Sequence, residues 1–108
     1  WSNLYKIAPT TGNPSNFEKS LQEIISVQLV KMEIEEINPK YCIVLTNREW
    51  WEPFQHEFNL NDFGKNEFSE IEAVQKYKNT IIIITTRPFR SGNEKHVSQI
   101  LEVIKKFN

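Results

Sequence analysis

The run Ile81-Ile82-Ile83-Ile84 constrains the fold more than any other part of the sequence. A strand with one solvated face alternates apolar and polar residues, so four consecutive β-branched apolar residues are typical of a strand that is buried on both faces. We therefore predict a central strand here. We expect it to end at Arg87-Pro88, because proline cannot donate a hydrogen bond to a neighbouring strand.

The segment after this strand is the first place to look for function. Arg87, Pro88, Phe89, Arg90 and Ser91 lead through a glycine to a second helical pattern. In open α/β sheets, ligands bind outside the carboxyl ends of the strands, where such a loop would lie. The alternative is an ordinary connection between strand and helix, with solvated arginines.

Two further segments have strong periodicity. A capping-box pattern at Ser15 predicts the start of a helix that continues to Ile37. Two lines of mostly apolar residues along this helix predict a wide buried face. They are made of Phe17, Leu21, Ile24, Ile25, Gln28 and Met32 on one line and Val27, Val30, Ile34 and Ile37 on the other.

The run 41–46 follows Asn38-Pro39-Lys40 and predicts a second interior strand, parallel to the first. After it, Trp50, Trp51 and Phe54 either cover the end of the sheet or form a stacking surface.

The remaining segments are read more coarsely. Residues 1–9 suggest a short strand, residues 56–60 a brief extended segment, and residues 77–80 a tight hairpin that leads into the isoleucine strand. A closing helix after Asn93 should bury the face that carries Val97, Ile100, Leu101, Ile104 and Phe107, with His96 in solvent. These elements predict a single α/β domain over residues 1–108, a three-layer sandwich with a mostly parallel central sheet flanked by helices.

Composition excludes several classes of protein. The 108 residues carry a net charge of −1, so any polyanion would have to bind a local patch rather than a general basic field. His56 and His96 are far apart and Cys42 is the only cysteine, which leaves no metal-ligand spacing and predicts a buried, inert thiol. No glycine-rich nucleotide loop or nucleophile elbow is present, and we predict no cofactor. Neither a membrane span nor a signal peptide is visible, so we expect a cytoplasmic protein.

Three segments should meet at one edge of the sheet: Asn3 with the loop that follows it, Asn47 to Trp51, and Arg87 to Asn93. They combine amide, aromatic and guanidinium groups. These groups hydrogen-bond a base edge, stack on a base face and hold phosphates, which points to DNA or a nucleotide as partner.

The order of these residues resembles the uracil-DNA glycosylase superfamily. Residues 3–14 are similar to a segment of the form "N-x-x-K-x-x-P…G-N", residues 39–45 to "P-K-x-x-x-x-L-G", and residues 84–91 to a motif written "H-P-S-x-x-S". The resemblance covers nearly all of the chain and implies the C-terminal two thirds of such a domain. Because the chain opens at Trp1 rather than methionine, we expect it to be a piece of a longer protein.

The resemblance implies roles for particular residues. Asn3 would read a flipped pyrimidine, and the loop with Arg87, Pro88, Phe89 and Ser91 would enter the duplex. Arg87 stands in place of the histidine that helps to stabilise the base anion, and Asn47 stands where a glycine usually follows the strand. The family's first motif would precede Trp1.

Three functions follow as hypotheses. The first is base recognition or hydrolysis of an N-glycosidic bond on DNA, with Arg87 as the catalytic residue and Asn3, Asn47, Trp50, Pro88, Phe89, Arg90 and Ser91 binding substrate. The second is a non-catalytic module for nucleotides or nucleic acid, which the arginine in place of histidine favours. The third is a domain whose arginine loop binds a phosphorylated small molecule or a protein.

Overall fold

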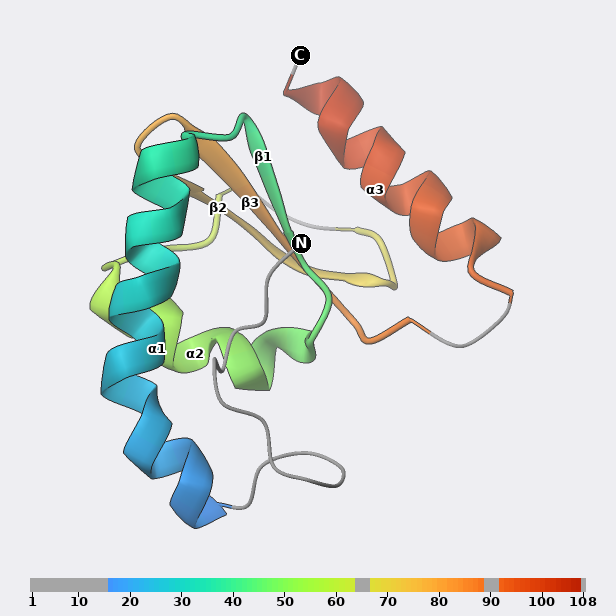
Figure 1. The fold of residues 1–108 in the computed structure, drawn as a ribbon. Helices are drawn as coiled ribbons and strands as arrows, with labels where there is room; N and C mark the ends of the chain where they lie inside the picture. The colour runs from blue at the N-terminus through green and yellow to red at the C-terminus, as the bar shows by residue number, and fades with distance from the viewer. Residues whose placement is uncertain (1–15, 64–66, 89–91, 108) are drawn as a thin grey trace. The chain divides into compact units, whose positions relative to one another are not determined.

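A computed structural model describes residues 16–63, 67–88 and 92–107 of the chain (Figure 1). The chain divides into two compact units, residues 1–38 and residues 39–108. Its elements in order are α1 (Asn16–Ile37), β1 (Tyr41–Val44), α2 (Asn47–Glu57), β2 (Ile71–Tyr77), β3 (Thr80–Thr85) and α3 (Glu94–Lys106). The strand over residues 1–9 lies outside the described residues.

The described part of the first unit is α1, a helix of 22 residues. Its predicted end is confirmed, since the Asn38 amide donates to the Ile34 carbonyl at 2.8 Å and Asn38 has a φ of 50°. A left-handed asparagine after the last turn is a common helix terminus.

Burial on α1 follows only one of the two predicted apolar lines. Val27, Val30 and Ile34 are buried, whereas Ile25 and Met32 are more than 60 % exposed. The prediction of a wide buried face was therefore wrong for Ile25 and Met32, and also for Ile37 at the end of the helix, which is 71 % exposed. At 100° per residue, Ile25 and Met32 lie on the opposite side of the helix from Val27 and Ile34, so one neighbouring surface cannot cover both lines.

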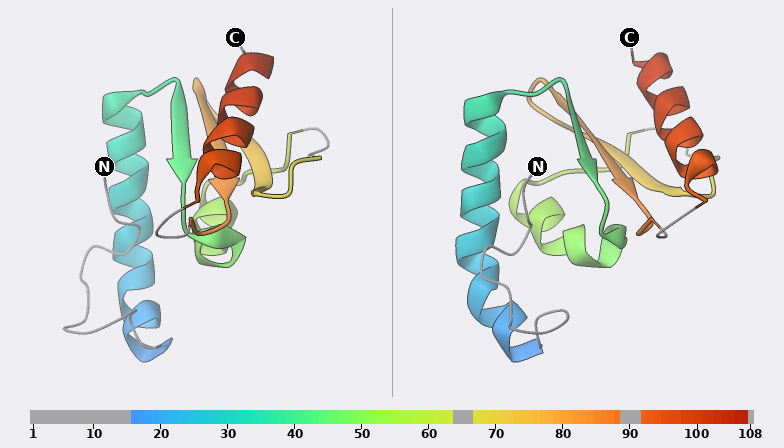
Figure 2. Two further views of the ribbon diagram at one scale, coloured as in Figure 1. Left: turned by 90° about the vertical axis from the view of Figure 1, so that its right-hand side faces the viewer. Right: turned by 45° about the vertical axis from the view of Figure 1, so that its right-hand side comes forward.

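The second unit contains a three-stranded mixed sheet with the order β1-β3-β2 (Figure 2). β1 runs parallel to β3, with Tyr41 opposite Ile81 and Val44 opposite Ile84. β2 runs antiparallel to β3, so the predicted mostly parallel sheet flanked by helices was wrong. The reason is the two-residue connection Lys78-Asn79, because so short a link can join only antiparallel strands.

The hairpin and the central isoleucine strand are both confirmed. β3 lies between its two neighbours, and Ile82, Ile83 and Ile84 are fully buried. The second run was wrongly predicted to be interior, because β1 is the outer strand of the sheet over the described residues, and Ile43 is 42 % exposed.

Two threonines hold β1 against β3 at its ends. The hydroxyl of Thr80 donates to the Pro39 carbonyl at 2.6 Å, and that of Thr85 lies 3.3 Å from the Val44 carbonyl and 2.9 Å from the Thr86 carbonyl. Both threonines are buried, and a buried hydroxyl destabilises the fold unless it finds such a partner. The polar residues that flank the isoleucine run therefore fix the parallel pairing.

α3 packs on one face of the sheet. A buried cluster joins Ile71, Val74 and Ile83 of the strands with Ile100 and Val103 of the helix. One extra residue in β2, Glu72, shifts the register between Ile71 and Ala73, which turns Ile71 toward this cluster.

The buried side of α3 differs from the prediction. Ile104 and Phe107 pack on the cluster as expected, but Val97 and Leu101 are about half exposed and His96 is buried. The prediction centred the buried side on the period of the aliphatic residues, and it missed that His96 has a hydrogen-bond partner inside the fold.

No helix was predicted over residues 47–57, where α2 lies with Pro53 inside it. Trp51, Phe54 and Phe58 are spaced by three and four residues and are all buried, and the rings of Trp51 and Phe54 stack with centroids 5.2 Å apart. These rings therefore cover the sheet, the first of the two roles predicted for the aromatic residues. The extended segment predicted over residues 56–60 was wrong, because the helix continues to Glu57.

A buried glutamine joins α2 to β2. The side-chain carbonyl of Gln75 accepts a hydrogen bond from the Trp51 indole at 2.9 Å, and its amide donates to Gln55 at 2.8 Å and to Asp62 at 3.2 Å. Gln75 is fully buried, so these bonds replace its contacts with water.

We expect Gln75→Leu to destabilise the fold by about 3 kcal/mol, because the substitution keeps the volume but leaves the Trp51 donor buried and unpaired. The free energy of unfolding, measured by urea titration, tests this. Lys76→Leu, at the exposed neighbouring position of the same strand, is the control. A Gln75→Leu protein as stable as the control would show that the network contributes nothing.

Asp62 extends this network to the surface. Burial raises the pKa of its carboxyl, but hydrogen bonds from Arg48 and Gln75 and the charge of Arg48 outweigh burial and hold the pKa below its ordinary value. The two terminal guanidinium nitrogens of Arg48 donate to the carboxylate, at 2.9 and 2.8 Å.

A carboxyl with a lowered pKa in the folded state stabilises the fold above its unfolded pKa, about 3.9, and loses that contribution as the pH falls through the folded pKa. We therefore expect the stability difference between the wild type and Asp62→Asn to be constant from about pH 8 to 5 and to shrink below about pH 4. Urea titrations at several pH values measure it, with Glu67→Gln as the control. A difference that does not vary with pH would contradict the ionic role.

Candidate functional site

The carboxyl ends of β1 and β3 lie together, as their parallel pairing requires. The side-chain oxygen of Asn47 accepts a hydrogen bond from the Arg87 backbone amide at 2.7 Å. The prediction that the segments with Asn47 and Arg87 meet at one edge of the sheet is therefore confirmed. Of the other predicted site residues, Trp50 and Pro88 are described by the structure. Asn3, Phe89, Arg90 and Ser91 lie outside the described residues.

Asn47 is suited to this position by its backbone. It is the first residue of α2 and has a φ of 71°, in the left-handed region that favours glycine and that asparagine tolerates better than most residues. Its side chain was predicted to bind substrate. In the structure its oxygen holds the end of β3.

Thr86 and the backbone amide of Arg87 are held by hydrogen bonds from several parts of the fold, in an arrangement that we call the Thr86 clamp. The Thr86 amide donates to the Glu70 carbonyl at 3.0 Å, and the Thr86 hydroxyl donates to the Glu70 carboxylate at 2.8 Å. The ring Nε2 of His96 lies 2.9 Å from the Thr86 carbonyl and must donate to it, and Asn47 accepts from the next amide. Groups from α2, α3 and the turn before β2 therefore fix the backbone at Thr86 and the start of Arg87.

His96 and Glu70 are the clamp residues that the sequence did not reveal. His96 was expected in solvent, but it is 7 % exposed. Glu70 is in turn held by Gln99 of α3, whose side-chain oxygen accepts from the Glu70 amide at 2.7 Å. The three-residue spacing of His96 and Gln99 places both on one side of a helix. This spacing is the sequence feature that could have indicated a shared polar role for them.

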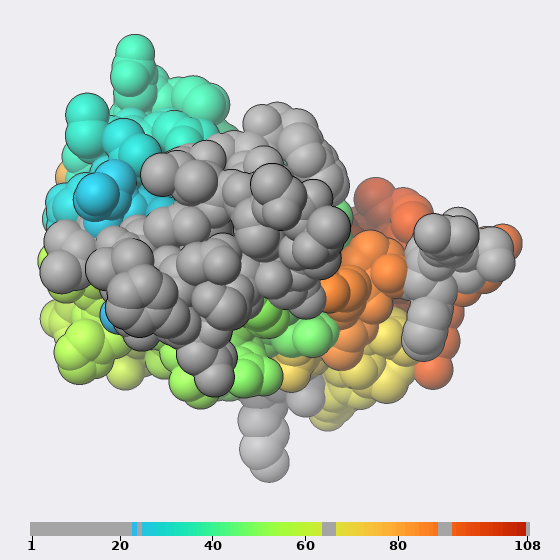
Figure 3. Space-filling model, turned by 60° about the horizontal axis from the view of Figure 1, so that its bottom comes forward, coloured from blue at the N-terminus to red at the C-terminus, as the bar shows by residue number. Residues whose placement is uncertain are grey.

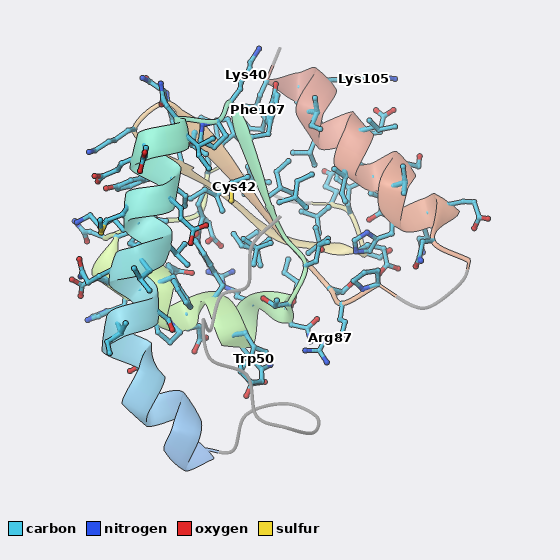
Figure 4. All side chains as sticks on the ribbon, viewed as in Figure 1. Lys40, Cys42, Trp50, Arg87, Lys105 and Phe107 are labelled. Atoms are coloured by element: carbon cyan, nitrogen blue, oxygen red, sulfur yellow. The ribbon has the colours of Figure 1, made fainter. Side chains whose placement is uncertain are left out.

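The clamp presents the side chain of Arg87 to solvent. Arg87 is exposed, and its guanidinium makes no hydrogen bond or ion pair with the residues that the structure describes. Pro88 follows it and limits the backbone on its other side. In Figure 4, Arg87 points away from the sheet at the end where β1 and β3 terminate.

Trp50 projects toward the same end of the sheet as Arg87 (Figure 4). It is half-buried, in contrast to Trp51, which is fully buried. In the space-filling view, atoms at the end of β3 reach the surface beside those of α2 and of the segment before β2 (Figure 3). Trp50 and Arg87 therefore lie at the same end of the sheet, and the backbone of Arg87 is held by the clamp.

The start of α2 is not open to a ligand, because the protein supplies its own carboxylate there. Glu72 of β2 accepts a hydrogen bond from the Arg48 amide at 2.8 Å. Thr46, the residue before the helix, makes no capping bond with its side chain. Since Arg48 is also paired with Asp62, Arg87 is the better candidate for an anion contact.

A polar surface depression of about 490 Å³ lies elsewhere on the second unit. It is lined by Arg48, Glu52, Gln55, His56, Asn59, Leu60 and Asn61. Neither Arg87 nor Trp50 borders it, and its arginine is already paired, so we do not place the site there.

Cys42 has the properties of an unreactive thiol. It is free and half-buried on β1, and burial raises its pKa to about 11. The thiolate is therefore a very small fraction near neutral pH. In the described ranges, no three His, Cys, Asp or Glu side chains gather in a way that could hold a metal ion, and no helix there has the length and apolar character to span a membrane.

Comparison with known proteins adds no relative. No family model, no curated protein and no solved structure matches the chain. The resemblance to the uracil-DNA glycosylase superfamily therefore rests on the quoted residues alone, and function has to be argued from the site.

Substitutions at Asn47 separate its side chain from its backbone. We expect Asn47→Gly to destabilise the fold by about 1 kcal/mol, since it removes the acceptor but allows the positive φ, and Asn47→Ala by about 2 kcal/mol, since it adds backbone strain. Urea titration measures both. Equal losses in the two variants would show that the left-handed backbone is unimportant.

Proposed function

We propose that the carboxyl end of β1 and β3 binds a phosphate group of a nucleotide or of single-stranded DNA, with Arg87 as the anchor and Trp50 as a stacking surface. The observation that carries the proposal is the Thr86 clamp, which fixes the backbone of an arginine whose guanidinium has no partner in the described part of the chain. Binding of this kind requires no catalytic group.

Arginine suits a phosphate because its planar guanidinium can donate two parallel hydrogen bonds to it. A fixed backbone supports such a contact, since less conformational freedom is lost on binding. Three different parts of the fold supply the hydrogen bonds of the clamp. That is more than the backbone groups of an exposed turn need in order to be hydrogen-bonded. This supports a role for Arg87 beyond solubility.

The type of ligand follows from charge and from the neighbouring ring. With a net charge of −1, the chain has no general field for polyanions, so affinity must come from a few local contacts. An aromatic side chain stacks on any base and adds affinity without sequence preference. A single strand or a nucleotide exposes base faces, whereas a duplex does not.

Hydrolysis of an N-glycosidic bond is a second candidate, from the resemblance stated above. A guanidinium on a backbone that is fixed in advance of binding could stabilise the anion that develops on a leaving base, which favours this candidate. Asn47 would then act through the clamp rather than on the base, because its oxygen is already bonded to the Arg87 amide. Release of uracil from single-stranded DNA by the wild type and not by Arg87→Ala would support it.

We expect Arg87→Ala to weaken binding of a fluorescently labelled oligothymidine by roughly tenfold, and Arg87→Lys to have an intermediate effect, because lysine cannot bond two phosphate oxygens in one plane. Fluorescence anisotropy measures the affinity. Nucleoside monophosphates and inorganic phosphate are competitors, which separate recognition of the base from recognition of phosphate.

The dependence on salt provides a sharper measure. Loss of one phosphate contact should reduce the slope of log K against log salt concentration by about 0.7 for a single strand. Lys95→Ala removes an exposed cation on α3 and is the matched control. If Arg87→Ala has the affinity and the slope of the control, Arg87 does not bind the strand and the proposal fails.

A further inference from the structure

The side of α3 that faces away from the sheet is partly apolar. Val97 and Leu101 are 53 % and 51 % exposed, while the buried residues of the helix, His96, Ile100 and Val103, lie on its other side. A shallow groove of about 530 Å³ follows this side, lined by Asn93, Glu94, Val97, Ser98, Leu101, Glu102 and Lys105. We call Glu94, Val97, Ser98, Leu101 and Lys105 the outer face of α3.

The spacing along the outer face is the same from either end. Glu94, Ser98, Leu101 and Lys105 are separated by four, three and four residues, with an acid at one end and a base at the other. An antiparallel copy of the helix, centred between Ser98 and Leu101, would place each Leu101 on the Ser98 of the other copy. It would also place each Glu94 opposite the Lys105 of the other copy.

We propose that the outer face of α3 is a self-association surface, on which α3 of a second copy of this chain packs antiparallel about a two-fold axis. Such an interface is isologous, so every contact occurs twice. The leucine over serine fills space by pairing a large residue with a small one, and the two Glu94–Lys105 pairs fix direction and register. This surface is independent of the function proposed for Arg87.

The charges at the ends of the helix are available for this pairing. Lys105 points away from the sheet, whereas Phe107 points toward it (Figure 4). Lys105 lies 3.5 Å from Glu102 in its own helix, but both side chains are more than half exposed, and such a pair is weak enough to be exchanged. A helix of 13 residues is only about 20 Å long, so the contact is small and the dimer should be weak and reversible.

Sedimentation equilibrium of the 108-residue chain over a wide concentration range tests the proposal. We expect a reversible monomer–dimer equilibrium that Leu101→Glu abolishes and that Glu94→Lys or Lys105→Glu weakens by roughly tenfold. The double variant with both charges exchanged should regain the dimer, because each pair is restored with opposite sign. A merely structural role for either charge would not produce this rescue.

Glu49→Lys is the matched control for Glu94→Lys, since both remove an acidic residue from the first turn of a helix. It should leave dimerisation unchanged, and circular dichroism should show that every variant is folded. A chain that stays monomeric up to millimolar concentration would overturn the proposal. A dimer that persists in Leu101→Glu, or a double variant no stronger than the single variants, would also overturn it.

Discussion

The pairing of β3 with a strand on each side is the constraint on which the second unit depends. The isoleucine run has no polar face, so it is stable only where both faces and both edges are covered. Parallel β1 covers one edge and antiparallel β2 the other. Because β1 and β3 run the same way, Asn47 and Arg87 come to the same end of the sheet, and the candidate site exists for that reason.

Polar side chains determine the positions that hydrophobic packing leaves open. Apolar contacts have little directional preference, whereas a buried hydrogen bond is expensive to misplace. Thr80 and Thr85 fix the ends of the parallel pair, and Gln75 fixes α2 against β2. The Thr86 clamp does the same for the peptide before Arg87. The candidate site is therefore supported by the same kind of contact that orients the core.

Much of the framework could be read from local patterns. The central strand, the end of α1, the hairpin before β3 and the meeting of the Asn47 and Arg87 segments followed from β-branched runs, helix-stop residues and the geometry of parallel strands. α2 was missed because the helical spacing of the buried aromatic residues Trp51, Phe54 and Phe58 was not recognised. The sheet was predicted to be mostly parallel, although the predicted hairpin already required that β2 run antiparallel to β3.

The candidate site could be predicted only in part from the sequence, and the reason is physical. Arg87 is exposed and near a strand end, and both features follow from local sequence. The roles of His96 and Glu70 do not follow from local sequence. Glu70 depends on a partner that is distant in sequence, and His96 depends on which side of α3 faces the sheet. Val97 and Leu101 illustrate the same limit, since the helix buries a histidine with a carbonyl partner in preference to two aliphatic side chains.

The sequence by itself determined that an isoleucine strand would be central, that a cation-bearing loop would follow it, and that Cys42 would be unreactive. Those properties depend on the local periodicity of apolar residues, on the proline that ends the strand, and on the position of the cysteine within an apolar run. Only the tertiary structure decided that the sheet is mixed, that Asn47 supports the backbone of Arg87, and which side of α3 faces solvent. The sheet type depends on the direction of β2, which the short link to β3 sets, whereas the other two outcomes depend on hydrogen bonds between residues 10 and 40 positions apart, which no local pattern encodes.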